Sequence, residues 1–584
     1  MASLFIAALV VVTLSAVAAP GVSERVSLSS GVQANSHSYA ASLSADGRFV
    51  AFDSYSSNLV PGDTNNTPDV FVYDRQTGVT ERVSVDSAGV QGDSYSMEPS
   101  ISGDGRFVAF YSYASNLVTG DTNDDGDIFV HDRQTGITER VTVDSAGNEA
   151  NDFTFPPNIS ADGRYVAFDS RASNLVPGDT NAIGDVFVHD RQTGVTERVS
   201  VDSAGNQGNS ESEGPALSAD GRYVAIDSWA SNLVPGDTNG DYDIFVHDRQ
   251  TGATERVSVD SAGNEANESS YFTAIGADGR FVAFASRASN LVAGDDNGAA
   301  DVFVHDRQTG STERVSVDGS GDQGNGDSGQ YGLGISGDGR FAIFRSVASN
   351  LVAGDSNGFA DVFIHDRQTG MTAAVSVDSQ CGQANGHSSY PAISSDGRLA
   401  GFNSLASNLV TDDTNHASDV FVHTLADADG GGLAALCRGD ADNDGMPDTA
   451  EDSFPCLDPT VDDASLDPDG DVLTNLVETQ IGTNPCVADS DGDGFDDGLE
   501  TWVGTDPLAT CPGVPGVDDA WPLDFNIDRA VNINDLLPEF KQDLGAIAPD
   551  PGYTPRYDLN LDGAINIDDL LPGFKQSFNS YCTP

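Results

Sequence analysis

The sequence predicts an all-β protein whose main part is a seven-bladed β-propeller, and three observations lead to this fold. One tripeptide, Asp-Gly-Arg, recurs at intervals of 58 residues, with a single interval of 60. Its seven copies begin at Asp46, Asp104, Asp162, Asp220, Asp278, Asp338 and Asp396. Six of the units also contain four short runs rich in Val, Ile and Phe, the seventh contains three, and one further run precedes the first copy. A fixed period of this length is typical of a stacked or radial array in which no unit buries its apolar faces alone.

Four strands are expected in each unit. In the third unit the innermost strand should end near Ile159, and Arg164–Asp169, Asp185–Asp190 and Glu197–Val201 should follow. Asp-Gly-Arg and Asp-Arg-Gln-Thr-Gly lie between these runs and suit tight hairpin turns, because Gly and Asp tolerate a positive φ. The near-continuous apolar runs indicate strands covered on both faces. Four such antiparallel strands form a propeller blade.

The two ends of the repeat region predict how the ring closes. The fourth run of the unit occurs at Glu24–Leu28, Glu81–Val85, Glu139–Val143, Glu197–Val201, Glu255–Val259, Glu313–Val317 and Ala373–Val377. The first copy precedes any Asp-Gly-Arg, and the seventh unit ends at Asp419–His423 without a fourth run. We therefore expect Glu24–Leu28 to complete the last blade, which leaves the sheet without an open edge.

The repeat has a recognisable consensus. The motif S-x-D-G-R-x-V-A-F, followed by D-V-F-V-x-D-x-x-T-G-x-T-x-R-V-S, resembles the TolB-like or WD40-like (PD40) propeller repeat of exported bacterial proteins. The resemblance covers residues 23–425. It does not include the separate N-terminal domain of TolB itself, so a role in the Tol–Pal system is not implied.

The N-terminus and the cysteines both predict export. Residues 1–19 read as a signal peptide, because the apolar run Leu4–Val17 is too short to span a membrane and ends in small residues. No later segment is apolar enough to cross a bilayer. Five cysteines lie in the tail and Cys381 lies alone in the last blade, which allows 15 pairings. Local pairs Cys437–Cys456 and Cys486–Cys511 are favoured. We expect a secreted, extracellular or cell-surface protein, with the periplasm as the alternative.

The charge balance excludes some partners. With 27 basic and 91 acidic residues, the formal net charge is −64. Nucleic acid requires a basic face, and an anionic membrane surface would repel this chain. Two explanations for the acidity stay open, namely a saline environment and abundant calcium ligands.

The tail favours calcium. After a linker at 426–436, residues 437–510 contain three acidic loops with EF-hand spacing, in which positions 1, 3, 5, 9 and 12 carry oxygen ligands for a hard cation. The expected ligands are Asp440, Asp442, Asp444, Asp448 and Glu451; Asp467, Asp469, Asp471, Asn475 and Glu478; and Asp489, Asp491, Asp493, Asp497 and Glu500. In the second loop Val472 replaces the Gly of the sharp turn, so strain or weaker binding is expected there. Carboxylates about 5 Å apart repel by about 3 kcal/mol, so such loops should open without calcium. The alternative is a solvated acidic linker.

Two further resemblances concern this tail. Glu478–Pro485 and Glu500–Pro507 share the pattern Glu-x-x-x-Gly-Thr-x-Pro, which resembles thrombospondin type 3-like repeats. That resemblance implies a calcium-stiffened stalk. Residues 520–584 resemble a type I dockerin, because two acidic loops 34 residues apart each lead into Leu-Leu-Pro-x-Phe-Lys-Gln. The resemblance implies calcium ligands at Asp524, Asn526, Asp528, Asn532 and Asp535, and at Asp558, Asn560, Asp562, Asn566 and Asp569. It also implies a cohesin-type scaffold as partner. Arg529 in place of Gly, and Pro538 and Pro572 in the first helical turns, depart from the pattern. A self-folded calcium cap is the alternative.

The propeller itself predicts a binding face. The tight turns share one side, so both long connections share the other, where binding usually occurs on rigid scaffolds. The second connection places an aromatic residue beside most innermost strands, at Tyr39, Tyr95, Phe155, Tyr271, Tyr331 and Tyr390, whereas blade 4 has Glu211 and Glu213. These rings suit stacking on a carbohydrate or gripping a peptide, and packing at the blade tops is the alternative.

The repeated polar residues of the blades favour structural roles. The first long loop repeats Asp-x-Asn-x-x-x-Asp, which suits turn capping, with further calcium sites as the alternative. One His before Asp-Arg recurs in five blades, as expected of a structural strand position.

No catalytic residue is predicted, because no nucleophile elbow, zinc helix or phosphate loop occurs. Two functions stay open. One is a calcium-dependent binding or display module; the other is a polysaccharide-degrading lyase or glycoside hydrolase with its site at the channel mouth. Fold alone does not decide between them.

Overall fold

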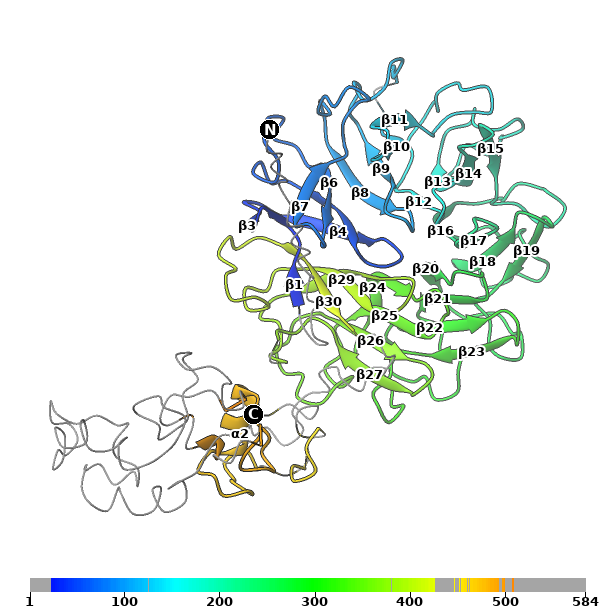
Figure 1. Ribbon diagram of the computed structural model, residues 1–584. Coiled ribbons are helices and arrows are strands. Elements are labelled where there is room, and N and C mark those ends of the chain that lie inside the picture. The colour runs from blue at the N-terminus through cyan, green and yellow to red at the C-terminus, as the bar shows by residue number, and fades with distance from the viewer. Residues whose placement is uncertain are drawn as a thin grey trace, which may run out of the picture. The chain divides into compact units, whose positions relative to one another are not determined.

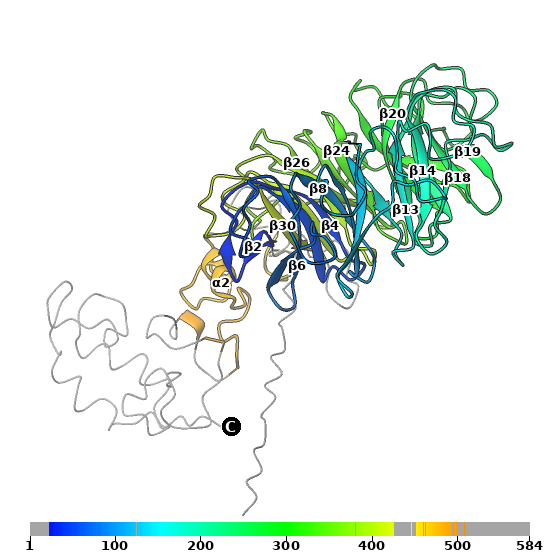
Figure 2. The ribbon, with the colours of Figure 1, turned by 90° about the horizontal axis from the view of Figure 1, so that it is seen from above.

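The computed structural model contains seven four-stranded antiparallel sheets arranged around a common axis (Figure 1). The structure describes residues 23–123, 125–379 and 381–425 of the propeller. Of the tail it describes residues 446, 451, 453–458, 461, 463–492, 496–498, 501 and 507–508. The chain divides into two compact units, Met1–Gly439 and Asp440–Pro584. The predicted all-β fold is confirmed, and the ring is seen from a second direction in Figure 2.

The strands follow the chain outward from the axis in each blade. Blade 1 contains β4 (Ser38–Leu43), β5 (Phe49–Ser54), β6 (Asp69–Asp74) and β7 (Val79–Arg82). Blade 2 contains β8 (Ser96–Ile101), β9 (Phe107–Ser112), β10 (Asp127–Asp132) and β11 (Ile137–Arg140). Blade 3 contains β12 (Asn158–Ile159), β13 (Tyr165–Ser170), β14 (Asp185–Asp190) and β15 (Val195–Arg198). Blade 4 contains β16 (Ser212–Leu217), β17 (Tyr223–Ser228), β18 (Asp243–Asp248) and β19 (Ala253–Arg256).

The remaining blades repeat this order. Blade 5 contains β20 (Ser270–Ile275), β21 (Phe281–Ser286), β22 (Asp301–Asp306) and β23 (Ser311–Arg314). Blade 6 contains β24 (Ser328–Ile335), β25 (Phe341–Ser346), β26 (Asp361–Asp366) and β27 (Met371–Ala374). Blade 7 contains β28 (Ser388–Ile393), β29 (Leu399–Ser404), β30 (Asp419–Thr424) and β1 (Ser23–Arg25). The third strands lie as predicted, whereas each outermost strand begins about two residues earlier than predicted and ends at the Arg position.

The N-terminal strand closes the ring as predicted. Strand β1 pairs antiparallel with β30, with Ser23 opposite His423 and Arg25 opposite Phe421. The N–H of Val26 then donates to the carbonyl of Val420 at 2.8 Å. The pairing is shorter than the predicted Glu24–Leu28, because the chain turns into a small hairpin of β2 (Leu28–Ser29) and β3 (Val32–Gln33).

The core lies between neighbouring blades and not inside any one of them. Each of seven buried clusters joins side chains of two adjacent sheets, and the cluster of Val26, Phe52 and Val420 joins blade 7 to blade 1. Both faces of a middle strand are therefore buried, which accounts for the apolar runs Val-Phe-Val and Val-Ala-Phe. The ring is the unit of stability, because no blade can cover its own faces.

The predicted hairpin turns form in every blade. In blade 2 the glycine of Asp-Gly-Arg, Gly105, has a φ of 72°, and a Cβ added there would lie 2.2 Å from Cδ2 of Phe49 in blade 1. Glycine is thus required here for two reasons: the backbone has a positive φ, and the neighbouring sheet leaves no room for a Cβ atom. The recurrent His is structural as predicted: Nδ1 of His131, for example, lies 2.9 Å from Oγ1 of Thr138.

Ion pairs connect successive blades on the tight-turn side. Arg191, Arg249 and Arg307 each donate from Nε at 2.6 Å to a glutamate of the preceding blade. Arg75 makes the same contact with Glu24 and so ties blade 1 to the N-terminal strand. Between blades 6 and 7 both partners are replaced, by Ala373 and Leu425, which are buried in one apolar cluster.

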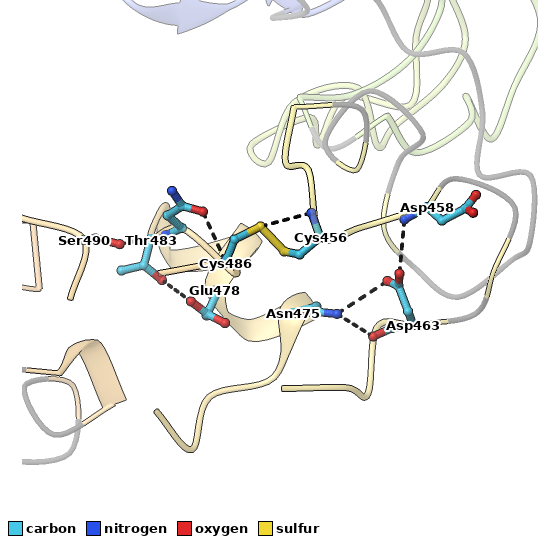
Figure 3. Close-up of a disulfide and its surroundings, with 9 residues drawn as sticks. Cys456, Asp458, Asp463, Asn475, Glu478, Thr483, Cys486 and Ser490 are labelled. Atoms are coloured by element: carbon cyan, nitrogen blue, oxygen red, sulfur yellow. Dashed lines mark hydrogen bonds between the residues drawn. A yellow bond between two sulfur atoms is a disulfide. The ribbon is translucent and has the colours of Figure 1, made fainter. Parts of the chain in front are cut away.

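The described part of the tail is small and contains one disulfide. Helix α2 (Asn475–Ile481) begins after Thr474 and ends at Gly482, which has a φ of 88°. Cys456 and Cys486 form a disulfide beside it (Figure 3). The predicted local pairs Cys437–Cys456 and Cys486–Cys511 are therefore wrong, because the fold brings residues 30 positions apart together instead. Cys381 is disulfide-bonded too. Within the described ranges no helix has the length and apolarity needed to cross a membrane.

Candidate functional site

Blades that are otherwise nearly identical differ where they face the axis. The fifth residue of the second strand occupies the variable position of Val-Ala-Phe-x-Ser. From blade 1 to blade 7 it is Asp53, Tyr111, Asp169, Asp227, Ala285, Arg345 and Asn403. The neighbouring positions keep their apolar residues because they pack between blades. Within the second strand, the change between charged, polar and apolar residues is concentrated at this one position, which indicates that it has different roles in different blades.

The innermost strands are irregular at the same level. Register shifts interrupt their pairing in six blades, between Tyr39 and Ser42 in blade 1, for example, and between Met97 and Ser100 in blade 2. Residues at these bulges have positive φ, namely Ala40, Glu98, Gly214, Phe272, Tyr331 and Tyr390. For residues other than glycine this conformation costs about 1 kcal/mol or more, and such strain is common at binding sites.

A cavity of about 460 Å³ opens at this level, and we call it the axial pocket. Its lining comes mainly from the innermost strands of blades 1, 2, 3, 6 and 7. The lining residues are Tyr39, Ala40, Ala41, Asp53, Tyr55, Met97, Glu98, Pro99, Pro156, Pro157, Gly332, Tyr390 and Pro391. The volume and the mixture of rings with a few polar groups suit a small ligand or the end of a longer one.

Two carboxyl groups of the axial pocket have perturbed protonation. Burial raises the pKa of Asp53 to about 7, although its Oδ1 accepts the backbone N–H of Glu98 at 3.2 Å. The pKa of Glu98 is raised as well, because the surrounding walls desolvate its carboxyl group. Near neutral pH the carboxyl group of Asp53 can therefore donate as well as accept hydrogen bonds.

The structure brings together only some of the predicted aromatic residues. Tyr39 and Tyr390 line the axial pocket, and Tyr331 precedes Gly332 of its wall. Tyr95 packs against Tyr113 with ring centres 4.6 Å apart, and Tyr271 packs edge-on against Phe272. Phe155 does not line the pocket and is 40% exposed. The six rings are thus split between a pocket and separate packing contacts.

Sequence reasoning missed Asp53, Tyr55 and Glu98. The signal that could have found Asp53 is the variable fifth position of the second strand. Tyr55 lies two residues further on, at a second position that varies between the blades. Glu98 carries no such signal, since only the bulge of β8 brings it to the cavity.

In six blades an arginine of the outermost strand lies beside the carboxylates of the repeated acidic loop. Asp237, Asp243 and Glu265 have carboxylate oxygens close enough to hold a metal ion, and so do their counterparts Asp121, Asp127 and Glu149. Nη1 of Arg256 lies 3.2 Å from Asp243 and 2.6 Å from Glu265. The Asn of the motif caps its own turn, as Oδ1 of Asn239 accepts the N–H of Asp241 at 2.9 Å. Capping and ion pairing therefore account for this motif, with the guanidinium supplying the cation.

The tail contains the other acidic clusters that could hold a metal ion. Asp467, Asp469 and Asp471 form one, and Asp471, Glu478 and Asp497 form a second whose members are all buried. The second cluster joins two predicted loops, and the N–H of Gly498 donates to Asp471 at 2.8 Å. Burial and the neighbouring carboxylates raise the pKa of Glu478 to about 8.

The donor set of these clusters fits calcium. Oε2 of Glu478, Oδ2 of Asp469 and Oδ1 of Asn475 are buried and have no hydrogen-bond partner within the described residues. Oxygen atoms alone, supplied by several carboxylates and an amide, are the ligands that calcium prefers. Glu478 lies on α2 (Figure 3), and Val472 has a φ of 86°, so the strain expected at this position is present.

Other predicted ligands cannot be placed in the same way. Glu451, Asp489 and Asp491 lie within the described residues but belong to neither cluster. The remaining predicted ligands lie outside the described residues: Asp440, Asp442, Asp444, Asp448, Asp493, Glu500, Asp524, Asn526, Asp528, Asn532, Asp535, Asp558, Asn560, Asp562, Asn566 and Asp569. The whole dockerin-like segment, 520–584, is among them, and so is the signal peptide.

The fold defines the class of this protein, a seven-bladed β-propeller followed by a second compact unit. Comparison with protein-family models finds no match, and neither does comparison with curated proteins. Among solved structures, an oligogalacturonate lyase in complex with manganese is similar with 12% identity and a TM-score of 0.43, covering 70% of this chain and 93% of that one. An oligogalacturonate lyase from Vibrio parahaemolyticus has 12% identity and a TM-score of 0.42, with coverages of 70% and 100%. TolB from Acinetobacter baumannii has 15% identity and a TM-score of 0.32, with coverages of 65% and 81%. These likenesses concern the propeller fold alone.

Proposed function

We propose that this protein is an exported binding or display module whose propeller holds a carbohydrate ligand in the axial pocket. The observation that carries the proposal is the pocket itself. Tyr39, Tyr55 and Tyr390 line it together, and Tyr39 and Tyr390 lie at bulges of the innermost strands. Tyrosine rings stack on the apolar faces of sugars, while Asp53 and Glu98 supply hydrogen bonds to hydroxyl groups.

The ligand is neutral or positively charged. A chain with a formal charge of −64 and acidic groups in its pocket repels anionic polysaccharides. A peptide ligand is the other occupant that these rings accommodate.

Oligosaccharide binding by the full-length protein tests the proposal. Neutral oligosaccharides would be titrated against the wild type, Tyr390→Ala and Tyr271→Ala. Tyr271 is the matched control, since it faces the same side without lining the pocket. We expect affinity to fall about fivefold in Tyr390→Ala, because one stacking contact contributes about 1 kcal/mol, and to stay unchanged in Tyr271→Ala. Equal effects of the two substitutions would contradict a site in the axial pocket.

We also propose that the tail binds calcium and serves for attachment. The support is the buried cluster of Asp471, Glu478 and Asp497. Buried oxygen atoms around α2 also have no hydrogen-bond partner among the described residues. In this proposal the dockerin-like segment folds around further calcium ions and docks on a cohesin-type scaffold protein outside the cell or at its surface, or in the periplasm.

Calcium calorimetry on the full-length protein tests the tail. We expect binding that weakens when Glu478→Gln removes a ligand and that is unaffected by Glu268→Gln, an exposed acidic residue of the propeller. If calcium bound equally well to Glu478→Gln and Glu268→Gln, the heat would come from nonspecific screening of the protein's negative charge and not from a site at Glu478.

A polysaccharide-degrading lyase or glycoside hydrolase is the second candidate. The observation in its favour is the position of Asp53 in the axial pocket with its pKa raised to about 7, since a carboxyl group protonated near neutral pH can act as a general acid. Release of shortened saccharides that is abolished in Asp53→Asn would favour the enzyme, whereas binding without turnover would favour the module.

A further inference from the structure

Blade 4 places two acidic side chains directly opposite each other. Glu213 of β16 pairs with Asp227 of β17. The corresponding pairs are Tyr39 with Asp53, Met97 with Tyr111, Tyr271 with Ala285 and Ser389 with Asn403. Directly opposed residues have Cβ atoms about 5 Å apart, and like charges there are destabilising. None of the other pairs carries this cost.

Two more carboxyl groups surround the pair. The charge of Glu213 acts on both Asp227 and Asp169, and Glu211 acts on Glu213. The positive side chain paired with this group among the described residues is Arg171, whose Nη2 lies 2.8 Å from Oε1 of Glu211. Four carboxyl groups thus face one guanidinium, which leaves an excess of negative charge.

Asp227 differs from the two other buried aspartates at its position. Asp53 and Asp169 each accept a bulge N–H of the next blade, from Glu98 and Gly214 respectively, so each has a hydrogen-bond partner for its carboxyl group. Asp227 is 6% exposed, and its Oδ1 has no hydrogen-bond partner in the described part of the chain. A buried and unpaired carboxylate oxygen is costly unless something binds it.

That oxygen points at the bulge that carries Glu213. A Cβ on Gly214 would lie 2.4 Å from Oδ1 of Asp227. Blades 1, 2, 5 and 7 have Ala40, Glu98, Phe272 and Tyr390 at their bulges. Blade 4 has a glycine, which leaves room for the carboxylate of Asp227 to approach the backbone of the bulge.

Two aromatic rings lie beside Glu213. Tyr242 donates a hydrogen bond from its hydroxyl to Glu213. The indole of Trp229 stacks on Tyr242 with ring centres 5.9 Å apart, and Trp229 is 51% exposed. Its own Nε1–H is already used, as it donates to the carbonyl of Gly240 at 2.7 Å. The exposed ring face is therefore free to contact a ligand.

We propose that Glu211, Glu213, Asp227, Trp229 and Tyr242 form a second binding site, for a ligand that carries a primary ammonium group. Carboxylates and ring faces together are the ordinary means of recognising an organic cation. No three of these carboxyl groups come close enough to hold a metal ion within the described residues, which disfavours a metal as occupant. None of the five residues lines the axial pocket, so this site goes beyond the proposed function.

Matched probes separate the ammonium group from the rest of a ligand. The full-length protein would be titrated, at physiological salt, with a trisaccharide of glucosamine and with its N-acetylated counterpart. The same experiment would use tri-lysine and acetylated tri-lysine. We expect at least one free amine to bind about tenfold more tightly than its acetylated form, as for one charge-assisted hydrogen bond.

Two variants decide whether the affinity comes from this site. Glu213→Gln keeps the shape of the side chain and removes its charge, and we expect it to abolish the preference for the free amine. Glu268→Gln removes one charge from the long connection of blade 5 and should leave the preference intact, which controls for general attraction by an acidic protein. A second readout is thermal stability: Glu213→Gln should melt higher than the wild type without ligand, because it relieves the repulsion with Asp227.

Each possible outcome either supports or overturns the proposed ammonium site. Preference for tri-lysine alone, lost in Glu213→Gln, keeps the ammonium site and assigns it to peptides. Equal binding of free and acetylated probes overturns the proposal, and so does an equal effect of the two variants. Calcium binding that requires Glu213 while the amines do not bind would replace the ammonium site with a metal site. Loss of binding to the axial pocket in Tyr390→Ala is independent of all these results.

Discussion

Single residues distinguish the seven blades, and the acidic loops show how. In six blades an arginine of the outermost strand lies between the two aspartates of the loop: Arg25, Arg82, Arg140, Arg198, Arg256 and Arg314. In blade 6 this position is Ala374, and Asp355 faces Asp361 without the arginine. Burial, with Asp361 beside it, raises the pKa of Asp355 to about 6.

Supplying the missing arginine should stabilise the propeller. We expect Ala374→Arg to raise the free energy of unfolding by about 1 to 2 kcal/mol at pH 7.5. Because folding raises the pKa of Asp355 to about 6, the wild-type protein loses stability as the pH rises through that value. The stability gained by adding the arginine should therefore shrink below about pH 6. Urea unfolding at pH 7.5 and at pH 5 measures both effects.

The control is the opposite change in blade 5. Arg314→Ala leaves Asp295 and Asp301 without their guanidinium and should lower stability by about 3 kcal/mol. A gain for Ala374→Arg that is the same at both pH values would contradict a role for Asp355.

The buried Asp53 predicts a second dependence on pH. Its pKa is raised to about 7, so the folded state holds this proton more tightly than the unfolded state does. Stability from this group is therefore lost as the pH rises from about 4 to about 7. Asp53→Asn keeps an acceptor for the N–H of Glu98, and we expect it to be more stable than the wild type at pH 8 and equal at pH 4. Thermal melts across this range measure the difference.

Asp132 gives the opposite sign and serves as the control. Its hydrogen bonds with Arg106 hold the pKa of that carboxyl below its usual range, so it stabilises the fold above about pH 4. Asp132→Asn should therefore be less stable than the wild type at pH 8. If both variants shifted stability in the same direction there, the explanation by burial would fail.

At the scale of elements, one strand of three residues decides whether the ring is closed. Strand β1 supplies the fourth strand of blade 7, and Val26 beyond it is fully buried between blades 7 and 1. Arg25 adds contacts to Asp412 and Asp413, and Glu24 accepts from Arg75. In blade 7 the fourth strand thus comes from the N-terminal part of the chain, whereas in the other blades it follows the third strand directly along the chain.

Removal of this strand should weaken the whole propeller. We expect a chain that lacks residues 1–26 to melt well below the wild type and to associate, because β30 then has an open edge. A chain that lacks residues 1–22, which stops short of β1, is the control and should melt as the wild type does. Calorimetry and size-exclusion chromatography measure the two effects, and identical melting of the two truncations would rule out closure by β1.

At the scale of the molecule, the chain consists of two compact units that are stabilised by different interactions. The propeller is stabilised by apolar clusters between seven sheets. The described tail has a small core of Met446, Leu457 and Ala464, one disulfide and buried carboxylates. A core of that size contributes little by itself, and domains of this kind depend on disulfides or metal ions.

The propeller should therefore fold without the tail. We expect a chain that lacks residues 437–584, with Cys381→Ser because that cysteine is normally disulfide-bonded, to keep its β-sheet circular dichroism. It should also keep cooperative melting within a few degrees of the full chain. A broad, non-cooperative transition would show that the units depend on each other.

The sequence by itself determined the propeller, its seven blades, the closing strand and the structural role of the repeated histidines. Repetition made this possible, because each unit presents the same apolar spacing and the same turn residues, and these are local properties. Only the tertiary structure decided which distant side chains share a cavity. It joined Tyr39 to Asp53 and Glu98 through bulges, paired Cys456 with Cys486, and set Glu213 against Asp227. Such contacts depend on strand register and on the packing of neighbouring blades, which no local pattern of residues specifies.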